Sequence, residues 1–420
     1  MSSPATNDAD PSPMIGPARL IRAAFEGSDM AARADEILTL AGNGTLEAGT
    51  ALDLATILLL MHRFEPALQL QGEVLQGCRR FRLLASKPDA ATRVLVIATA
   101  GDLMANTPVD FLLDHPDFWV EYLFVLPGKD VPAALPDHDV CVVAVAYSSA
   151  NEPVLEALAS AAARWDRPVI NPPRQVLKTS RHGLAAALDG AEGLLIPAVA
   201  RMTKADIVSA GCRLPAGLRY PILARPIDTH AGNALQKIDR DEDLAAYIRE
   251  IDAAAYYLSQ FCDYSGPDGL FRKLRIVLID GIPFLCHMAI RDHWMIHYLN
   301  AGMSDDAAKR NAEALAMAEF DDRFVPRHRT AFAEIHRRTG LDYLILDCAE
   351  AQDGRLLIFE ADTGMVIHDM DPVDLYPYKR PQMHKVFAAF QNAVRTRAAR
   401  SDERPDLSSD PRTLRNEQQP

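Results

Sequence analysis

The sequence lacks the cysteine spacing of a disulfide framework or a zinc site. Its 420 residues include six cysteines, which stand far apart at positions 78, 141, 212, 262, 286 and 348. A disulfide-rich scaffold or a zinc ribbon would bring some of these cysteines into close pairs. We therefore expect six reduced cysteines that pack as core residues.

The chain also lacks an excess of basic residues, since its formal net charge is -13. Binding to nucleic acid or to an anionic membrane surface depends on clustered lysine and arginine. This composition argues against both partners and favours small molecules as ligands.

Long hydrophobic runs are missing as well. The longest, ATILLLM at 55–61, is too short to cross a bilayer. The first residues show no basic stretch followed by an apolar run, so we expect a cytoplasmic protein. The sequence also shows no Ser/His/Asp or Cys/His set of the kind that nucleophilic enzymes use.

What is present divides the chain into five parts. Residues 1–16 and 397–420 hold few large apolar side chains and are expected to be disordered tails. Residues 17–88 repeat apolar residues at helical spacing, which predicts a helical hairpin similar to one tetratricopeptide unit. Residues 89–176 alternate Val/Ile-rich strands with a helix, which predicts an α/β layer with a mainly parallel sheet. Residues 177–396 contain antiparallel hairpins and helices, so the whole chain is expected to be of mixed α/β (α+β) class.

The stretch LDYLILDCAEAQDGRLLIFEAD places three acids among residues that otherwise form buried strands. Asp353-Gly354 predicts a hairpin with a two-residue turn that needs positive φ at both central residues. In that register Asp347 lies opposite Glu360, and Asp362 points to the same face. Like charges at this spacing need a cation, and carboxylate oxygens suit Mg²⁺. The alternative to a metal site is an acidic hairpin that is fully exposed to solvent. The leucine and isoleucine residues around the acids argue against full exposure.

Cationic residues stand on the preceding strands. Arg225 ends the strand YPILARP, Lys237 lies on the next, and Lys273 and Arg275 share one face of a third. A guanidinium at the end of a strand can hold phosphate oxygens in a bidentate manner. A second Asp-Gly turn, at 280–281, predicts that Arg275 lies opposite Cys286.

The order of these parts, from about residue 93 to 395, resembles the ATP-grasp family, in particular its ribosomal-protein glutamate ligase and D-alanine–D-alanine ligase branches. In that family a strand ending in Lys-Pro precedes a glycine-rich phosphate loop, a hinge receives adenine, and an Asp followed by Glu-x-Asn binds two magnesium ions. The matching segments here are Arg225-Pro226, the loop THAGNAL at 229–235, the hinge SQFCDY at 259–264 and the three acids.

The resemblance implies an ATP-grasp fold with a parallel α/β domain before the grasp domain and a helical N-terminal segment. It also implies ATP and two Mg²⁺ ions as cofactors, with the metal on Asp347, Glu360 and Asp362. The resemblance implies that Arg225 and Arg275 are catalytic residues and that Arg275 stabilises an acylphosphate intermediate. The implied cofactor-binding residues are Arg181, Arg225, His230, Gly232, Lys237, Gln260, Phe261, Cys262, Asp263 and Lys273.

The sequence departs from the family pattern at several of these positions. Arg225 replaces the usual lysine, the phosphate loop keeps only Gly232, and Asp362 stands where the family has asparagine. Lys273 occupies a position where an acid often holds the ribose. An arginine keeps the charge but changes its reach, and fewer glycines mean less cradling of phosphates by the backbone.

The resemblance implies an ATP-dependent carboxylate-amine ligase, or one that uses another nucleophile, which acts through an acylphosphate on a small molecule or peptide. Two alternatives stay open at this stage: a kinase of a hydroxyl substrate with the same fold, and a partner-binding protein regulated by a degenerate nucleotide site. A homodimer and a protein partner at the helical N-terminus are left open as well.

Overall fold

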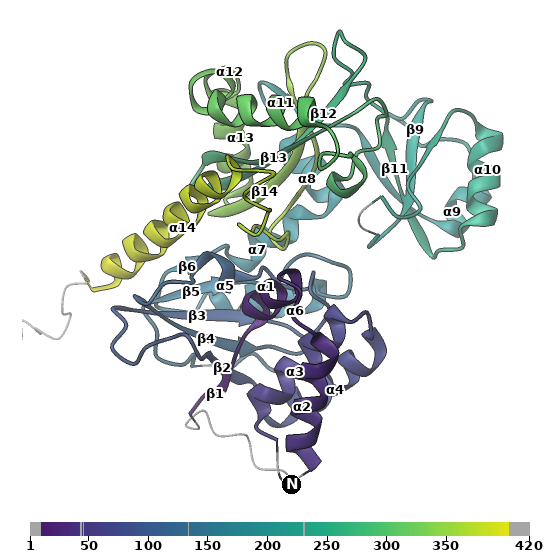
Figure 1. The fold of residues 1–420 in the computed structure, drawn as a ribbon. Coiled ribbons are helices and arrows are strands. Elements are labelled where there is room, and N and C mark those ends of the chain that lie inside the picture. The colour runs from purple at the N-terminus through teal and green to yellow at the C-terminus, as the bar shows by residue number, and fades with distance from the viewer. Residues whose placement is uncertain (1–9, 43, 45, 133, 230–231, 403–420) are drawn as a thin grey trace, which may run out of the picture.

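The computed structural model describes residues 10–402 apart from 43, 45, 133 and 230–231. Its three sheets fall into two halves, with the N-terminal helices and a six-stranded sheet in one and two smaller sheets in the other (Figure 1). The class is the mixed α/β one expected from the sequence. Within the described residues no helix is long and apolar enough to span a membrane.

The N-terminal segment is helical, as predicted, but it begins with a strand. Its elements are β1 (Ser12–Met14), α1 (Pro17–Phe25), α2 (Met30–Gly42), α3 (Ala48–Leu60) and α4 (Phe64–Gly77). We expected 1–16 to be a tail, and this is wrong for residues 12–16. The buried carboxylate of Asp53 on α3 accepts hydrogen bonds from the backbone N–H groups of Ile15 (2.7 Å) and Gly16 (3.1 Å). Gly49 lets α3 lie directly on β1, because a Cβ there would stand 1.8 Å from the Pro13 carbonyl oxygen.

The six-stranded sheet has the order β1-β2-β4-β3-β5-β6 and is mainly parallel, with β2 and β4 antiparallel. Runs of buried valine, isoleucine and leucine form its central strands because both faces of this sheet are covered. Its further elements are β2 (Arg80–Leu83), β3 (Thr92–Ala98), α5 (Val109–Leu112), β4 (Phe118–Phe124), β5 (Val140–Val143), α6 (Glu152–Ala162), β6 (Val169–Ile170), α7 (Pro173–Val176) and η1 (Leu177–Thr179).

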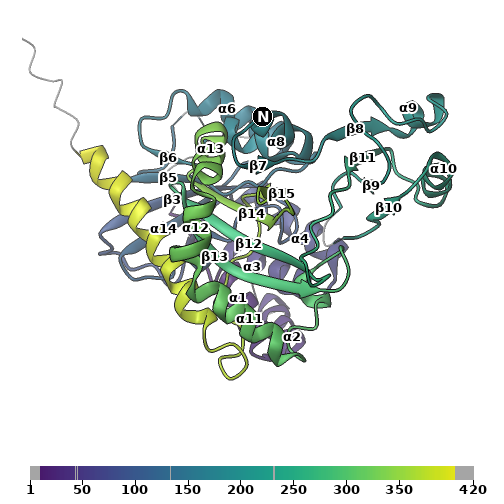
Figure 2. The same ribbon diagram turned by 90° about the horizontal axis from the view of Figure 1, so that it is seen from above.

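The second half contains two subdomains, each with its own sheet. The smaller one has an antiparallel sheet of order β10-β9-β11-β8 with two helices on one side (Figure 2). Its own core of isoleucine, leucine and tyrosine residues separates it from the rest of the chain. Its elements are β8 (Val199–Thr203), α9 (Lys204–Ser209), β9 (Ile222–Pro226), β10 (Gln236–Ile238), α10 (Asp241–Glu250) and β11 (Ala255–Gln260).

The larger subdomain has a five-stranded sheet of order β13-β12-β14-β15-β7. After α8 and β7 the chain leaves this subdomain to form the smaller one, and it returns from β11 through residues 261–270. The start of this connection belongs to the hinge predicted from the sequence. Its elements are α8 (Arg181–Leu188), β7 (Leu194–Leu195), β12 (Phe271–Ile279), β13 (Ile282–Arg291), η2 (Tyr298–Asn300), α11 (Ala307–Ala318), η3 (Phe320–Phe324), α12 (Val325–Arg327), α13 (Arg329–Thr339), β14 (Tyr343–Glu350), β15 (Leu356–Asp362) and α14 (Lys379–Asp402).

The turn between β14 and β15 differs from the prediction, although the key pairing is right. Ala351 pairs with Arg355, so the loop has three residues, and only Gly354 has positive φ (82°). This shifts the register by one residue, and a bulge at Phe359 shifts it back. Asp347 and Glu360 are therefore opposite one another, as predicted.

A bulge also corrects the prediction for Arg275. The Asp280-Gly281 turn has two residues, both with positive φ, as expected. The register then shifts next to Arg275, so that this residue lies opposite His287 and Cys286 is the extra residue.

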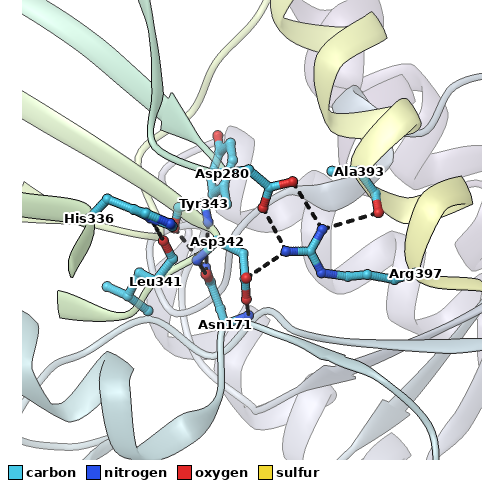
Figure 3. Close-up of polar contacts among 8 residues, drawn as sticks. All are labelled: Asn171, Asp280, His336, Leu341, Asp342, Tyr343, Ala393 and Arg397. Carbon is cyan, nitrogen blue, oxygen red and sulfur yellow. Dashed lines mark hydrogen bonds and ion pairs between the residues drawn. The ribbon is translucent and has the colours of Figure 1, made fainter. Parts of the chain in front are cut away.

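The C-terminal helix α14 also overturns part of a prediction, since 397–402 belong to this helix and not to a tail. Figure 3 shows why the helix continues: the Arg397 guanidinium donates to Asp280 and Asp342, with a distance of 2.6 Å from Nη2 to an oxygen of each. Gln391 on the same helix donates to the Leu112 carbonyl (3.0 Å), which ties α14 to the first half of the molecule.

Candidate functional site

Four charged or titratable side chains form one row across the larger sheet. Glu360 on β15, Asp347 on β14, Arg275 on β12 and His287 on β13 are successive register partners. Directly opposed residues in antiparallel strands point to the same face. The row therefore runs across four strands on one side of the sheet.

Asp347 is the centre of this row. It is 1% exposed, and Arg275 donates to both of its oxygens, from Nε (2.8 Å) and Nη2 (3.1 Å). Lys273 lies two residues before Arg275 and brings its Nζ within 2.7 Å of Oδ2. Burial raises the pKa of Asp347, but the charges of Arg275 and Lys273 outweigh it and hold that pKa well below its usual value. Asp347 therefore stays ionised and anchors two cations.

The two acids of β15 have different surroundings. Glu360 forms a short ion pair with Arg181 at the start of α8, and Asp362 accepts a hydrogen bond from the Gly364 N–H (3.0 Å). Burial raises the pKa of Glu360, but Arg181 and other cations hold it below its usual value. The three acids share a face, as predicted, yet the described part of the chain assembles no group of three acids, histidines or cysteines that could hold a metal.

Arg225 reaches this row from β9 of the smaller subdomain. It is 8% exposed; its Nε donates to Thr229 (3.1 Å), and its buried Nη2 has no hydrogen-bond partner among the described residues. Burial, together with the positive charge of Arg181, lowers the pKa of Arg225 to about 10. A buried guanidinium donor without a partner is costly, which makes the Arg225 Nη2 a candidate for contact with a ligand.

The site therefore holds more cationic than acidic groups. Arg181, Arg225, Lys273 and Arg275 come from both subdomains, while two carboxylates, on Asp347 and Glu360, account for the ion pairs seen among them. An anion with several oxygens, such as a polyphosphate, would supply the acceptors that this set needs.

The predicted hinge, residues 259–264, lies where the chain passes from the smaller to the larger subdomain. Its polar side chains already form hydrogen bonds with nearby backbone groups. The Gln260 amide donates to the Pro221 carbonyl (3.0 Å) and accepts from the Arg219 N–H (3.1 Å). Asp263 is exposed and accepts from the Ser265 N–H (2.9 Å), which is a local turn contact.

The apolar part of the hinge contains the Phe261 ring, which contacts a cation and a second aromatic ring. The Lys237 Nζ lies 4.7 Å from the centre of the Phe261 ring, and Trp294 packs edge-on against the same ring. Cys262 is half-buried, and burial raises the pKa of its thiol, which disfavours the thiolate form that a nucleophile needs. An aromatic ring beside a cation suits the binding of a heteroaromatic base.

The predicted phosphate loop is only partly described. His230 lies outside the described residues. Gly232 has φ 73°, a conformation that favours glycine, and a Cβ there would stand 3.6 Å from the Met295 sulfur. The loop thus approaches the segment that follows β13.

Sequence reasoning missed one end of the row. The His287 ring lies 4.5 Å from that of Tyr298, and the Tyr298 hydroxyl accepts a short hydrogen bond from buried Lys379. Glu313, fully buried, lies 3.5 Å from the same Nζ and accepts from Tyr378 (2.7 Å). The bulge that brings His287 opposite Arg275 has no sequence signal. Lys379 does have one: with His368, Asp369 and Asp371 it follows the three acids in sequence, which makes these four residues candidates for lining the acceptor pocket, with ordinary loop polarity as the alternative.

No family model matches the sequence, and no curated protein matches it. Solved structures do match. A RimK domain ATP-grasp protein from Sphaerobacter thermophilus is 18% identical, with 71% of this chain and 98% of that chain covered and a TM-score of 0.40. D-alanine–D-alanine ligase from Bacillus anthracis, complexed with ATP, is 12% identical (74% and 99% covered, TM-score 0.41). VanG D-Ala:D-Ser ligase from Enterococcus faecalis is 12% identical (73% and 99% covered, TM-score 0.47).

The arrangement of elements in the chain itself defines its fold. A mainly parallel α/β domain precedes two α+β subdomains, which meet at the hinge and both contribute cations to one site. This is the arrangement that the sequence resemblance to the ATP-grasp family implied.

Proposed function

We propose that this protein is an ATP-dependent ligase that joins a carboxylate to an amine or another nucleophile through an acylphosphate. The observation that carries the proposal is the buried Arg225 Nη2, which lacks a partner in the described structure and belongs to a site rich in cations from both subdomains. ATP phosphates would supply the missing acceptor.

The reaction would be one of positioning and charge neutralisation. A carboxylate oxygen of the substrate attacks the γ-phosphorus, the bond to the β,γ-bridging oxygen breaks, and ADP leaves. The nucleophile then attacks the acyl carbon, loses a proton, and releases phosphate. Arg225 and Arg181 hold the phosphates, while Arg275, fixed by Asp347, faces the transferred group. Electrostatic stabilisation of this kind needs no covalent residue of the protein.

Magnesium fits the donor set in part. Glu360 and Asp362 lie on one face of β15 and offer carboxylate oxygens, the ligands that Mg²⁺ prefers. Asp347 fits as a third ligand only if Lys273 and the Arg275 Nη2 leave its Oδ2, because both groups lie within hydrogen-bond distance of that oxygen. A bound Mg²⁺ would neutralise phosphate charge, and the long Lys273 side chain could then turn to the phosphates.

Thermal unfolding with ATP and Mg²⁺ tests the nucleotide site directly. We expect ATP and Mg²⁺ together to stabilise the protein by about 2.7 kcal/mol at a hundredfold excess over Kd, which raises the midpoint by a few degrees. Neither component alone should have this effect. Glu360→Gln should lose the shift, because it removes a negative charge that organises Arg181 and the metal.

The matched control is Glu250→Gln, the same change at an exposed position on α10, which should keep the full shift. No shift of the unmodified protein at millimolar ATP with Mg²⁺ would contradict the proposal. Product analysis then separates a ligase from a kinase: a ligase needs a nucleophile for phosphate release, whereas a kinase yields a stable phosphorylated product.

A further inference from the structure

The segment 363–378 joins the acids of β15 to α14 and lies against the first half of the molecule. The Thr107 hydroxyl donates to the Thr363 carbonyl in a buried hydrogen bond of 2.7 Å. At Gly364 a Cβ would stand 2.6 Å from the Ala146 Cβ, so the backbone passes in direct contact with the α/β domain. The start of this segment is thus held by two loops of the α/β domain, one before α5 and one after β5.

Helix α1 holds the middle of the segment. Arg22 Nη2 lies 2.8 Å from Asp369 Oδ1, and the other oxygen of Asp369 lies 3.2 Å from His384 Nε2. The Asp369 side chain is 12% exposed and the Arg22 side chain 30%, so the ion pair is partly shielded from water. An apolar cluster beside it contains Ala18, Ile21, Phe111, Val366 and Met370.

Two residues after Asp369, the segment is connected to the charged row through two further side chains. Asp371 Oδ2 lies 3.6 Å from the Lys379 Nζ, and Lys379 donates to Tyr298. Tyr298 packs on His287, which is the register partner of Arg275. One short segment therefore links α1 to the residues beside Arg275, which faces the transferred group in the proposed reaction.

We propose that Arg22 is a positioning residue, which fixes Asp369 and thereby sets the shape of segment 363–378 on the acceptor side of the site. This inference rests on the proposed function. It gives the N-terminal helices a role within the ligase site: α1 forms part of the support on which the acceptor pocket is built.

The same helix offers a matched control. Arg19, one turn earlier on α1, pairs with Asp114 of the α/β domain at 3.3 Å, and both side chains are about half exposed. Exposed ion pairs of this kind contribute little. Arg19→Gln therefore removes an equal charge from α1 without touching segment 363–378.

Hydrogen–deuterium exchange of the full chain tests the proposal, with ATP and Mg²⁺ as the probe. In Arg22→Gln we expect exchange within 363–378 to become roughly tenfold faster, the effect of losing a charge-assisted hydrogen bond. Exchange in β14 and β15 should be unchanged. Arg22→Lys should restore most of the protection, and Arg19→Gln should match the unmodified protein.

The nucleotide gives a second readout that a purely structural contact would not change. In the unmodified protein, ATP with Mg²⁺ should slow exchange both in β15 and in 363–378. In Arg22→Gln the slowing should persist in β15 and be lost in 363–378. Unchanged exchange of 363–378 in Arg22→Gln would overturn the proposal while leaving the nucleotide site intact. Absence of any ATP effect in the unmodified protein would instead count against the proposed function.

Discussion

Replacement of Arg225 by methionine is expected to stabilise the protein without nucleotide and to abolish its response to ATP and Mg²⁺. The buried guanidinium has a donor that finds no partner in the described structure, and burial already lowers its pKa. An apolar side chain of similar length removes that cost, so the free energy of unfolding should rise by about 1 kcal/mol. ADP release should fall by about a hundredfold, as when one preorganised donor is lost from an active site.

A gain in stability together with a loss of the ATP response would distinguish an arginine that binds ligand from one that supports the fold. Thermal unfolding with and without ATP and Mg²⁺ measures both quantities in one experiment. Arg213→Met, at an exposed position in the same subdomain, should leave the ATP-induced shift unchanged. A lower midpoint of Arg225→Met without ligand would show that Arg225 supports the fold, and a retained ATP shift would remove it from the site.

Asn171→Ala is expected to cost about 4 kcal/mol of unfolding free energy, the largest effect on stability that we predict. Asn171 is 2% exposed; its amide donates to the Tyr343 carbonyl (2.8 Å) and accepts from the N–H groups of Tyr343 (2.9 Å) and Asp342 (3.0 Å). Figure 3 shows these contacts beside Arg397. Alanine leaves buried backbone groups without partners, and it must also adopt φ 56°, which asparagine tolerates better.

Urea unfolding, followed by both fluorescence and circular dichroism, measures this loss. Asn392→Ala, on the exposed side of α14, is the control and should stay within about 0.5 kcal/mol. If Asn171→Ala were equally mild, the first and second halves of the molecule would not depend on this contact.

Periodicity and turn residues predicted most elements, because both act over a few neighbouring residues. The helices of 17–77, the strands of the α/β layer and the two Asp-Gly hairpins follow such local patterns. The bulges at Phe359 and Cys286 do not, since a bulge is stabilised by the packing of neighbouring strands. One bulge restored the predicted pair of Asp347 and Glu360; the other replaced the predicted partner of Arg275.

The two ends of the chain show the same limit. Composition predicted tails because large apolar side chains are scarce there. The Asp53 carboxylate nevertheless binds the backbone directly after β1, and Arg397 fixes the last turns of α14, so polar contacts between distant residues hold structure that composition does not predict. Such contacts join residues far apart in sequence, as Arg22 and Asp369 also do, and no local pattern reveals them.

The short outer strands of the six-stranded sheet determine how readily another chain could add a strand to it. β1 has three residues, one of them Pro13, and β6 has two, bracketed by Pro168 and Pro172. Proline removes a backbone donor, and a strand of two or three residues offers few groups to an incoming chain. Both borders of this sheet are therefore poor templates for the addition of a strand from another molecule. Loss of residues 10–16 would uncover the longer border of β2 and turn a protected edge into a site of aggregation.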